Sequence, residues 1–80
     1  MERTNAEQNA MVYEKVTLPV ARKIAGMTQI DLAEALEVSE STVINWEKGR
    51  SEPTVGQAIQ IANVVNRPLD SIIFLPKSAV

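Results

Sequence analysis

Hydrophobic residues recur at intervals of three and four positions between about residue 17 and residue 76, and this spacing predicts short amphipathic helices. Alternation of apolar and polar residues, the pattern of a half-buried strand, does not extend over a useful length. Residues 1–16 show no sustained periodicity, so we expect a flexible N-terminal tail there and a second short tail at residues 77–80. The pattern therefore predicts one all-α domain over residues 17–76.

Helix-capping residues divide this domain into five expected helices. Each of the first four helices follows a residue whose side-chain oxygen suits an N-cap, namely Thr17, Thr28, Ser39 and Thr54. Gly26 and Gly49 stand where the first and third helices should end, because a left-handed residue commonly closes a helix. With these limits, the helices are expected at about residues 17–25, 28–36, 40–48, 54–65 and 69–74.

Composition narrows the classes of function. The chain has 80 residues and neither Cys nor His, which excludes disulfides, thiolate metal sites and His-based catalysis. It shows no nucleophile paired with a base and no Gly-rich phosphate loop, so we expect no enzyme activity, no cofactor and no metal. No apolar run approaches the ~18 residues of a membrane span, and residues 1–11 lack the apolar centre of a signal peptide. We therefore expect a cytoplasmic protein that does not contact membranes.

Two of the expected helices are joined by a very short linker. The helices at about residues 28–36 and 40–48 are separated by Glu37, Val38 and Ser39. Such a linker is too short for an antiparallel hairpin, so the helices must cross sharply, which is the geometry of a helix-turn-helix. In such a unit the first helix lies across the phosphate backbone and the second enters the major groove of DNA. The spacing therefore favours DNA binding.

The residues of this unit resemble a known family. The pattern GMTQxxLAxxLxVSxSTVxxWExGRxxP at residues 26–53 resembles the phage repressor and Cro family of helix-turn-helix proteins, the XRE-like transcriptional regulators of phages and bacteria. The likeness extends over about residues 17–75. It implies a compact five-helix repressor-like domain that binds double-stranded DNA as a sequence-specific transcriptional regulator, and we expect a repressor. It also implies a homodimer on a roughly palindromic operator in the nucleoid.

The resemblance assigns roles to polar residues of the unit. The residues that match base-reading positions lie on the outer face of the 40–48 helix and are Glu40, Ser41, Ile44 and Asn45. Those that match phosphate-contacting positions are Gln29, Ser39, Thr42, Lys48, Arg50 and Ser51. Asn suits a bidentate contact with adenine, Glu accepts from cytosine N4, and Ile can touch a thymine methyl group. Without the resemblance, the same positions would be interpreted as a solvated helix face.

Two further positions concern the fold. The family often pairs an arginine of the first helix with a glutamate of the third, so the resemblance implies a partly buried salt bridge between Arg22 and Glu47. Glu37 departs from the family, which usually has Gly at this turn position because the backbone takes φ > 0. A Glu there should store roughly 1 kcal/mol of strain.

The charge pattern leaves a second function open. The net charge is −2, and between Gln29 and Arg50 only Lys48 and Arg50 are basic. The acidic residues of the same stretch are Asp31, Glu34, Glu37, Glu40 and Glu47. Because DNA-binding surfaces are usually basic, the alternative is a protein-interaction module, such as an antitoxin or an anti-repressor, on the same scaffold. A protein partner is compatible with either function. For a dimer, the candidate contacts are the outer apolar residues near the last expected helix, Ile73 or Leu75.

Overall fold

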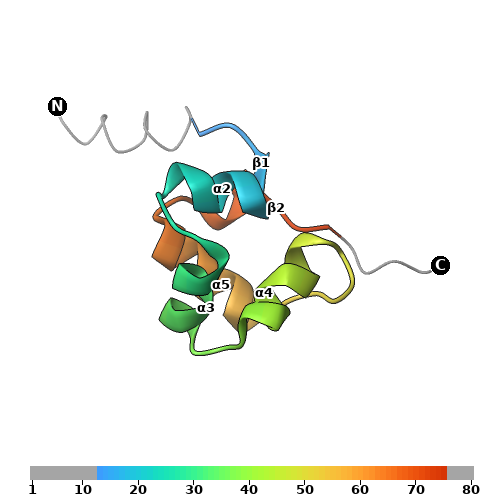
Figure 1. Ribbon diagram of the computed structural model, residues 1–80. Coiled ribbons are helices and arrows are strands. Elements are labelled where there is room, and N and C mark those ends of the chain that lie inside the picture. The colour runs from blue at the N-terminus through green and yellow to red at the C-terminus, as the bar shows by residue number, and fades with distance from the viewer. Residues whose placement is uncertain (1–12, 76–80) are drawn as a thin grey trace, which may run out of the picture.

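The computed structural model describes residues 13–75, which form four α-helices, one 3-10 turn and a pair of two-residue strands (Figure 1). In chain order the elements are β1 (Val16–Thr17), α2 (Leu18–Ile24), α3 (Gln29–Leu36), α4 (Glu40–Glu47), α5 (Val55–Val65), η1 (Leu69–Ser71) and β2 (Ile72–Ile73). Most of the two expected tails, residues 1–12 and 77–80, lies outside the described residues. None of the described helices combines the length and the apolar character needed to span a membrane.

The α-helices begin where the capping residues predict, although the side chain of Thr17 makes no capping hydrogen bond. Thr28 Oγ1 accepts a hydrogen bond from the Asp31 N–H at 3.0 Å, while Asp31 Oδ2 accepts one from the Thr28 N–H at 2.9 Å. Thr54 and Gln57 form the same reciprocal pair, at 3.0 and 2.8 Å. These bonds satisfy N–H groups that have no partner within the helix, so the starts of α3 and α5 are fixed by local sequence.

The core lies where the four α-helices meet. The largest fully buried side chains come one from each helix and are Leu18, Leu32, Val43 and Ile61. Trp46 of α4 is buried beside them and is only 4% exposed. Full burial of one such aliphatic side chain contributes roughly 1.5–3 kcal/mol, so these contacts are the main source of stability. The apolar stripes that the sequence predicts are confirmed as the inner faces of the helices.

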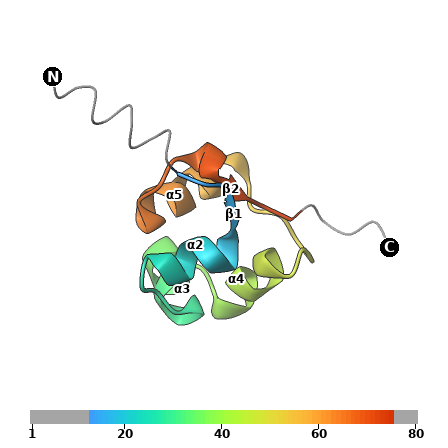
Figure 2. The ribbon, with the colours of Figure 1, turned by 90° about the horizontal axis from the view of Figure 1, so that it is seen from above.

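The end of the domain differs from the prediction. The α-helix expected over residues 69–74 is wrong, because Leu69–Ser71 forms a 3-10 turn and Ile72–Ile73 forms β2. β2 runs parallel to β1, with Val16 opposite Ile72 and Thr17 opposite Ile73, and Figure 2 shows both strands beside α2. Adjacent β-branched residues favour an extended backbone, and the segment is too short for a stable helix of its own. The described domain is therefore mainly helical with a small sheet, and not an all-α domain with five helices.

Arg67 ties the segment before α2 to the loop after α5. Its Nε donates to Ser71 Oγ at 3.0 Å, and its Nη2 donates to the carbonyl oxygen of Glu14 at 2.6 Å. The guanidinium carbon lies 5.1 Å from the centre of the Tyr13 ring, within the range of a cation–π contact. Among the described residues, contacts with the rest of the domain therefore include Tyr13 and Glu14, which lie before the start expected at residue 17.

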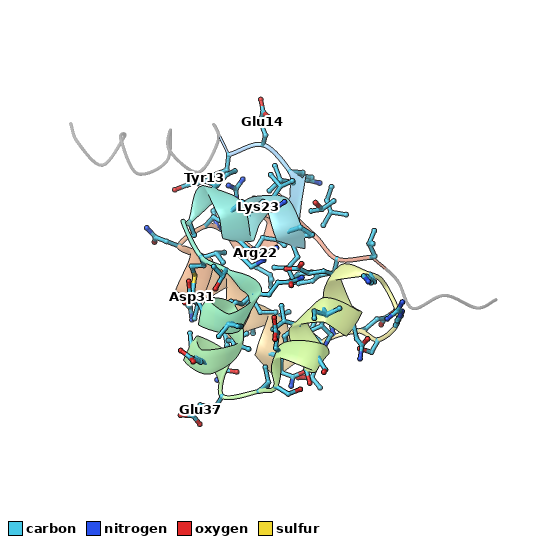
Figure 3. All side chains as sticks on the ribbon, viewed as in Figure 1. Tyr13, Glu14, Arg22, Lys23, Asp31 and Glu37 are labelled. Atoms are coloured by element: carbon cyan, nitrogen blue, oxygen red, sulfur yellow. The ribbon has the colours of Figure 1, made fainter. Side chains whose placement is uncertain are left out.

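The turn between α3 and α4 carries a residue in the left-handed region. Glu37 has φ 61° and ψ 43°, which confirms the expected positive φ, and Figure 3 shows it at the tip of the turn. The N–H of Glu37 donates to the Glu34 carbonyl at 3.2 Å, and that of Val38 donates to the Ala33 carbonyl at 3.0 Å. This is the bonding pattern that closes a helix through a left-handed residue, usually Gly.

We expect Glu37→Gly to stabilise the protein by up to about 1 kcal/mol, because Gly adopts positive φ without steric cost. The measurement is the free energy of unfolding from urea titration followed by circular dichroism. The matched control is Glu34→Gly inside α3, which should destabilise the protein by about 1 kcal/mol. A loss of stability in Glu37→Gly would show that the turn stores no strain.

Candidate nucleic-acid interface

α4 presents one face to the core and the opposite face away from it. Val43 and Trp46 are buried on the inner face. The four residues expected to read bases share the outer face, where Glu40 and Ser41 are exposed and Ile44 and Asn45 are half-buried. Glu40 and Ile44 are four positions apart, as are Ser41 and Asn45, so the four side chains form two adjacent rows along one side of the helix. A helix that enters the major groove needs such a continuous surface. α3 and α4 lie next to each other and are joined by the short turn (Figure 1).

The first turn of α4 is held by two of the residues expected to contact phosphates. Ser39 Oγ accepts a hydrogen bond from the Thr42 N–H at 3.1 Å and lies 2.9 Å from Thr42 Oγ1. If the Thr42 hydroxyl donates within this pair, the Ser39 hydroxyl proton is left to point outward, and an anion can accept it. The two side chains thus cap the helix and still retain a donor at its positively polarised end.

Gln29 is the first residue of α3, and its side chain is not simply exposed. Its Nε2 donates to Glu47 Oε1 at 2.9 Å, and the residue is half-buried. The backbone N–H groups of Gln29 and Ile30 have no acceptor among residues 13–75, as is usual for the first turn of a helix. No local pattern relates residues 18 positions apart, so the sequence did not predict the bond between Gln29 and Glu47.

A bidentate ion pair joins α2 to the last turn of α4. Arg22 Nε lies 2.7 Å from Glu47 Oε2, and Arg22 Nη2 lies 3.2 Å from Glu47 Oε1. The two side chains are only 9% and 5% exposed, and Figure 3 shows Arg22 beneath α2, facing α3 and α4. Arg22 Nη1 also donates to the carbonyl oxygen of Met27 at 3.0 Å, in the turn before α3. The guanidinium therefore connects three elements of the domain.

The loop after α4 folds back onto the end of that helix. The N–H groups of Arg50 and Ser51 lie 2.9 and 3.4 Å from the Asn45 carbonyl oxygen. Lys48 and Arg50 are exposed and Ser51 is half-buried. The bonds hold this loop, with its two cations, against the last turn of α4.

Acidic side chains are exposed along the helix-turn-helix formed by α3, the turn and α4. Those exposed on α3, on the turn and at the start of α4 are Asp31, Glu34, Glu37 and Glu40. The hydrogen bond from the backbone N–H of Thr28, with a smaller contribution from the Thr28 side chain, lowers the pKa of Asp31 from its ordinary value of 3.8. The Asp31 carboxylate is therefore charged at neutral pH and belongs to the helix cap.

Known proteins match this region of the chain. Residues 20–72 match the model of a family described as helix-turn-helix. A relative in Methanothermobacter thermautotrophicus, described as an uncharacterized HTH-type transcriptional regulator, is 41% identical over 54 residues. The alignment covers 68% of this chain and 78% of the relative.

Replacing Arg22 by Met should destabilise the protein by about 3 kcal/mol, because the Glu47 carboxylate would stay buried without its partner. Urea unfolding measured at pH 7 tests this. The neighbouring Lys23→Met variant removes an exposed cation from the same helix and should change stability by less than about 0.5 kcal/mol. Equal effects of the two substitutions would mean that the ion pair contributes little to stability.

The lowered pKa of Asp31 predicts a pH dependence with a definite sign. A carboxylate whose pKa is lower in the folded state stabilises the fold above about pH 4, and this contribution is lost as the pH falls through the folded pKa. Wild type should therefore melt at a higher temperature than Asp31→Asn at pH 7, and the gap should shrink below about pH 4. Circular dichroism melts between pH 2 and 7 measure it. Glu34→Gln is the control, because it removes a carboxylate from α3 without changing the cap. A difference in melting temperature between wild type and Asp31→Asn that stays constant with pH would contradict the prediction.

Proposed function

Because the chain belongs to the helix-turn-helix family that its residues 20–72 match, we propose that it is a sequence-specific transcriptional regulator that binds double-stranded DNA. In this proposal α4 enters the major groove, and the protein acts as a repressor of the Cro/C1 type. The observation that supports it best is the outer face of α4, which carries two exposed and two half-buried side chains suited to base edges. The opposite face of the same helix is buried, so only this face is available.

The base contacts follow from the chemistry of the outer face. Asn45 has the donor and acceptor that a bidentate contact with adenine N6 and N7 requires. Glu40 can accept only, which suits the amino group of cytosine, and Ser41 can pair with either type of group. Ile44 offers an apolar surface for a thymine methyl group. Together these residues of α4 would read several neighbouring base pairs.

Phosphates on either side of the groove would meet two kinds of donor. The N-terminal ends of α3 and α4 offer Gln29, the neighbouring backbone N–H groups, and the hydroxyls of Ser39 and Thr42. The loop after α4 offers Lys48, Arg50 and Ser51. Most of these groups are neutral, and neutral donors release fewer counterions than lysine or arginine, so binding should depend only moderately on salt.

A two-fold dimer would place two copies of α4 in successive major grooves, about 34 Å apart, on a roughly palindromic operator. The dimer surface that we favour is apolar and lies around the start of α5. Val55 is 77% exposed and Ile59 is also exposed. Val55 itself lines a shallow groove together with Pro53, Phe74 and Leu75. Because the exposed apolar side chains and the groove belong to one patch, two copies related by a two-fold axis can pack this patch against itself. Repression would follow when the bound dimer blocks polymerase at an overlapping promoter in the nucleoid.

A second function, a protein-interaction module such as an antitoxin or an anti-repressor, is favoured by the four exposed carboxylates of α3, the turn and the start of α4. These charges would repel phosphates that approach this side of the unit. They would instead suit a partner with a basic surface.

Selection of duplexes from a random DNA library, at low and at physiological salt, tests the two functions. A regulator should enrich a motif with two-fold-related half-sites about one helical turn apart. Weak binding without a motif, lost as the salt concentration rises, would be only the non-specific attraction between cations and phosphates. That outcome would contradict the DNA-binding proposal and favour the interaction module.

On the selected duplex, Asn45→Ala should reduce discrimination at one base position about tenfold, because a bidentate base contact accounts for about 1–3 kcal/mol of preference. Fluorescence anisotropy with the selected duplex and its single-base variants measures this change. The matched control is Asn63→Ala, an exposed Asn on α5, which should leave both affinity and preference unchanged. If Asn45→Ala keeps the full base preference, Asn45 does not read a base.

A further inference from the structure

The amide group of Gln29 is fixed by a buried carboxylate. Gln29 Nε2 lies 2.9 Å from Glu47 Oε1, and the Glu47 side chain is only 5% exposed. A carboxylate at neutral pH has no proton to donate, so Gln29 can meet it only with its NH2 group. The orientation of the amide is therefore determined by chemistry: the nitrogen faces Glu47, and the carbonyl oxygen faces away from it.

The fixed amide retains one donor. Its NH2 group has two protons, of which Glu47 accepts one. Residues 13–75 show no hydrogen bond from the second proton, and the backbone N–H groups of Gln29 and Ile30 beside it are also without acceptors there. Three donors without an acceptor thus lie on the first two residues of α3, where the helix dipole adds a positive field.

We propose that Glu47 is a positioning residue for DNA binding, which aims the remaining Nε2–H of Gln29 at a backbone phosphate. This inference rests on the proposed function. A free glutamine side chain must lose its rotamer freedom when it binds, and it can present its carbonyl oxygen, which a phosphate repels. Gln29 is already ordered by Glu47, so the cost of ordering it is met during folding and not during binding.

Arg22 makes this arrangement compatible with an anion. A lone carboxylate beside a phosphate would repel it, but both oxygens of Glu47 accept bonds from the Arg22 guanidinium, at 2.7 and 3.2 Å. The pair is neutral as a whole, so Glu47 adds no net negative charge beside the phosphate. Glu47 belongs to the last turn of α4, so the helix that would read bases also sets the position of a phosphate contact on α3.

The test compares the loss of affinity for the selected duplex that Gln29→Ala causes in two backgrounds. One is wild type, and the other carries Arg22→Met and Glu47→Leu together, which removes the acceptor without leaving a buried charge unpaired. On the selected duplex, Gln29→Ala should weaken binding about tenfold in wild type, equally for all sequences, and less than about threefold in the double variant. Gln60→Ala, at an exposed Gln of α5, should have no effect in either background.

Equal costs of Gln29→Ala in the two backgrounds would overturn the positioning role while leaving the proposed function intact. A wild-type protein that binds no duplex would overturn both. A purely structural role of the ion pair would weaken binding in the double variant but leave the cost of Gln29→Ala unchanged.

A measurement on the wild type does not require the double variant to fold. In the nuclear magnetic resonance spectrum of the free protein, one side-chain amide proton of Gln29 should be shifted downfield and slow to exchange, unlike those of Gln60. Addition of the selected duplex should then shift the other proton. Gln29 amide signals that coincide with those of Gln60 would overturn the proposal, because the amide would then not be held by Glu47.

Discussion

The arrangement of the helices depends on the buried ion pair between Arg22 and Glu47. Transfer of two charges out of water is unfavourable, and it is offset only when the pair is well aligned and its remaining donors are satisfied. The pair is bidentate, and each of the three guanidinium nitrogens of Arg22 donates a hydrogen bond, to Glu47 or to the Met27 carbonyl oxygen. Among the described residues no buried side-chain nitrogen or oxygen lacks a partner. The core determines that α2, α3 and α4 pack together, whereas this directional pair restricts the angle at which α4 leaves the body of the domain.

The same pair explains how a chain of net charge −2 can present a surface suited to DNA. Only a few cations border α4, and several carboxylates lie near α3. The groups proposed to face a phosphate at the helix starts are instead neutral donors, whose positive field comes from aligned peptide dipoles. The ion pair contributes no net charge, yet it orders Gln29 among these donors. Overall charge is therefore a poor guide to such a surface, because the field at the contact differs from the sum over the chain.

Features set by neighbouring residues were predicted from the sequence, and features set by distant contacts mostly were not. The caps at Thr28 and Thr54, and the positive φ of Gly26, follow from local chemistry, and the structure has them. The prediction of a fifth helix was wrong, because the extended form of Ile72–Ile73 depends on pairing with Val16–Thr17 at the other end of the domain. The outer face of α4 followed from helical periodicity. The bond between Gln29 and Glu47 depends on how α3 packs against α4, which no pattern within either helix reveals.

The turn between α3 and α4 shows that burial of the core outweighs local backbone strain. At Glu37 the left-handed backbone costs roughly 1 kcal/mol, and Gly would avoid that cost. The backbone adopts this conformation because α3 and α4 bury Leu32 and Val43 completely, and each of these contributes more than the strain costs. The turn also closes α3 through Val38 and starts α4 through Ser39, and both positions are fixed by their own hydrogen bonds. The orientation of the outer face of α4 is therefore set by the core and by the ion pair, and the residue in the turn adapts to it.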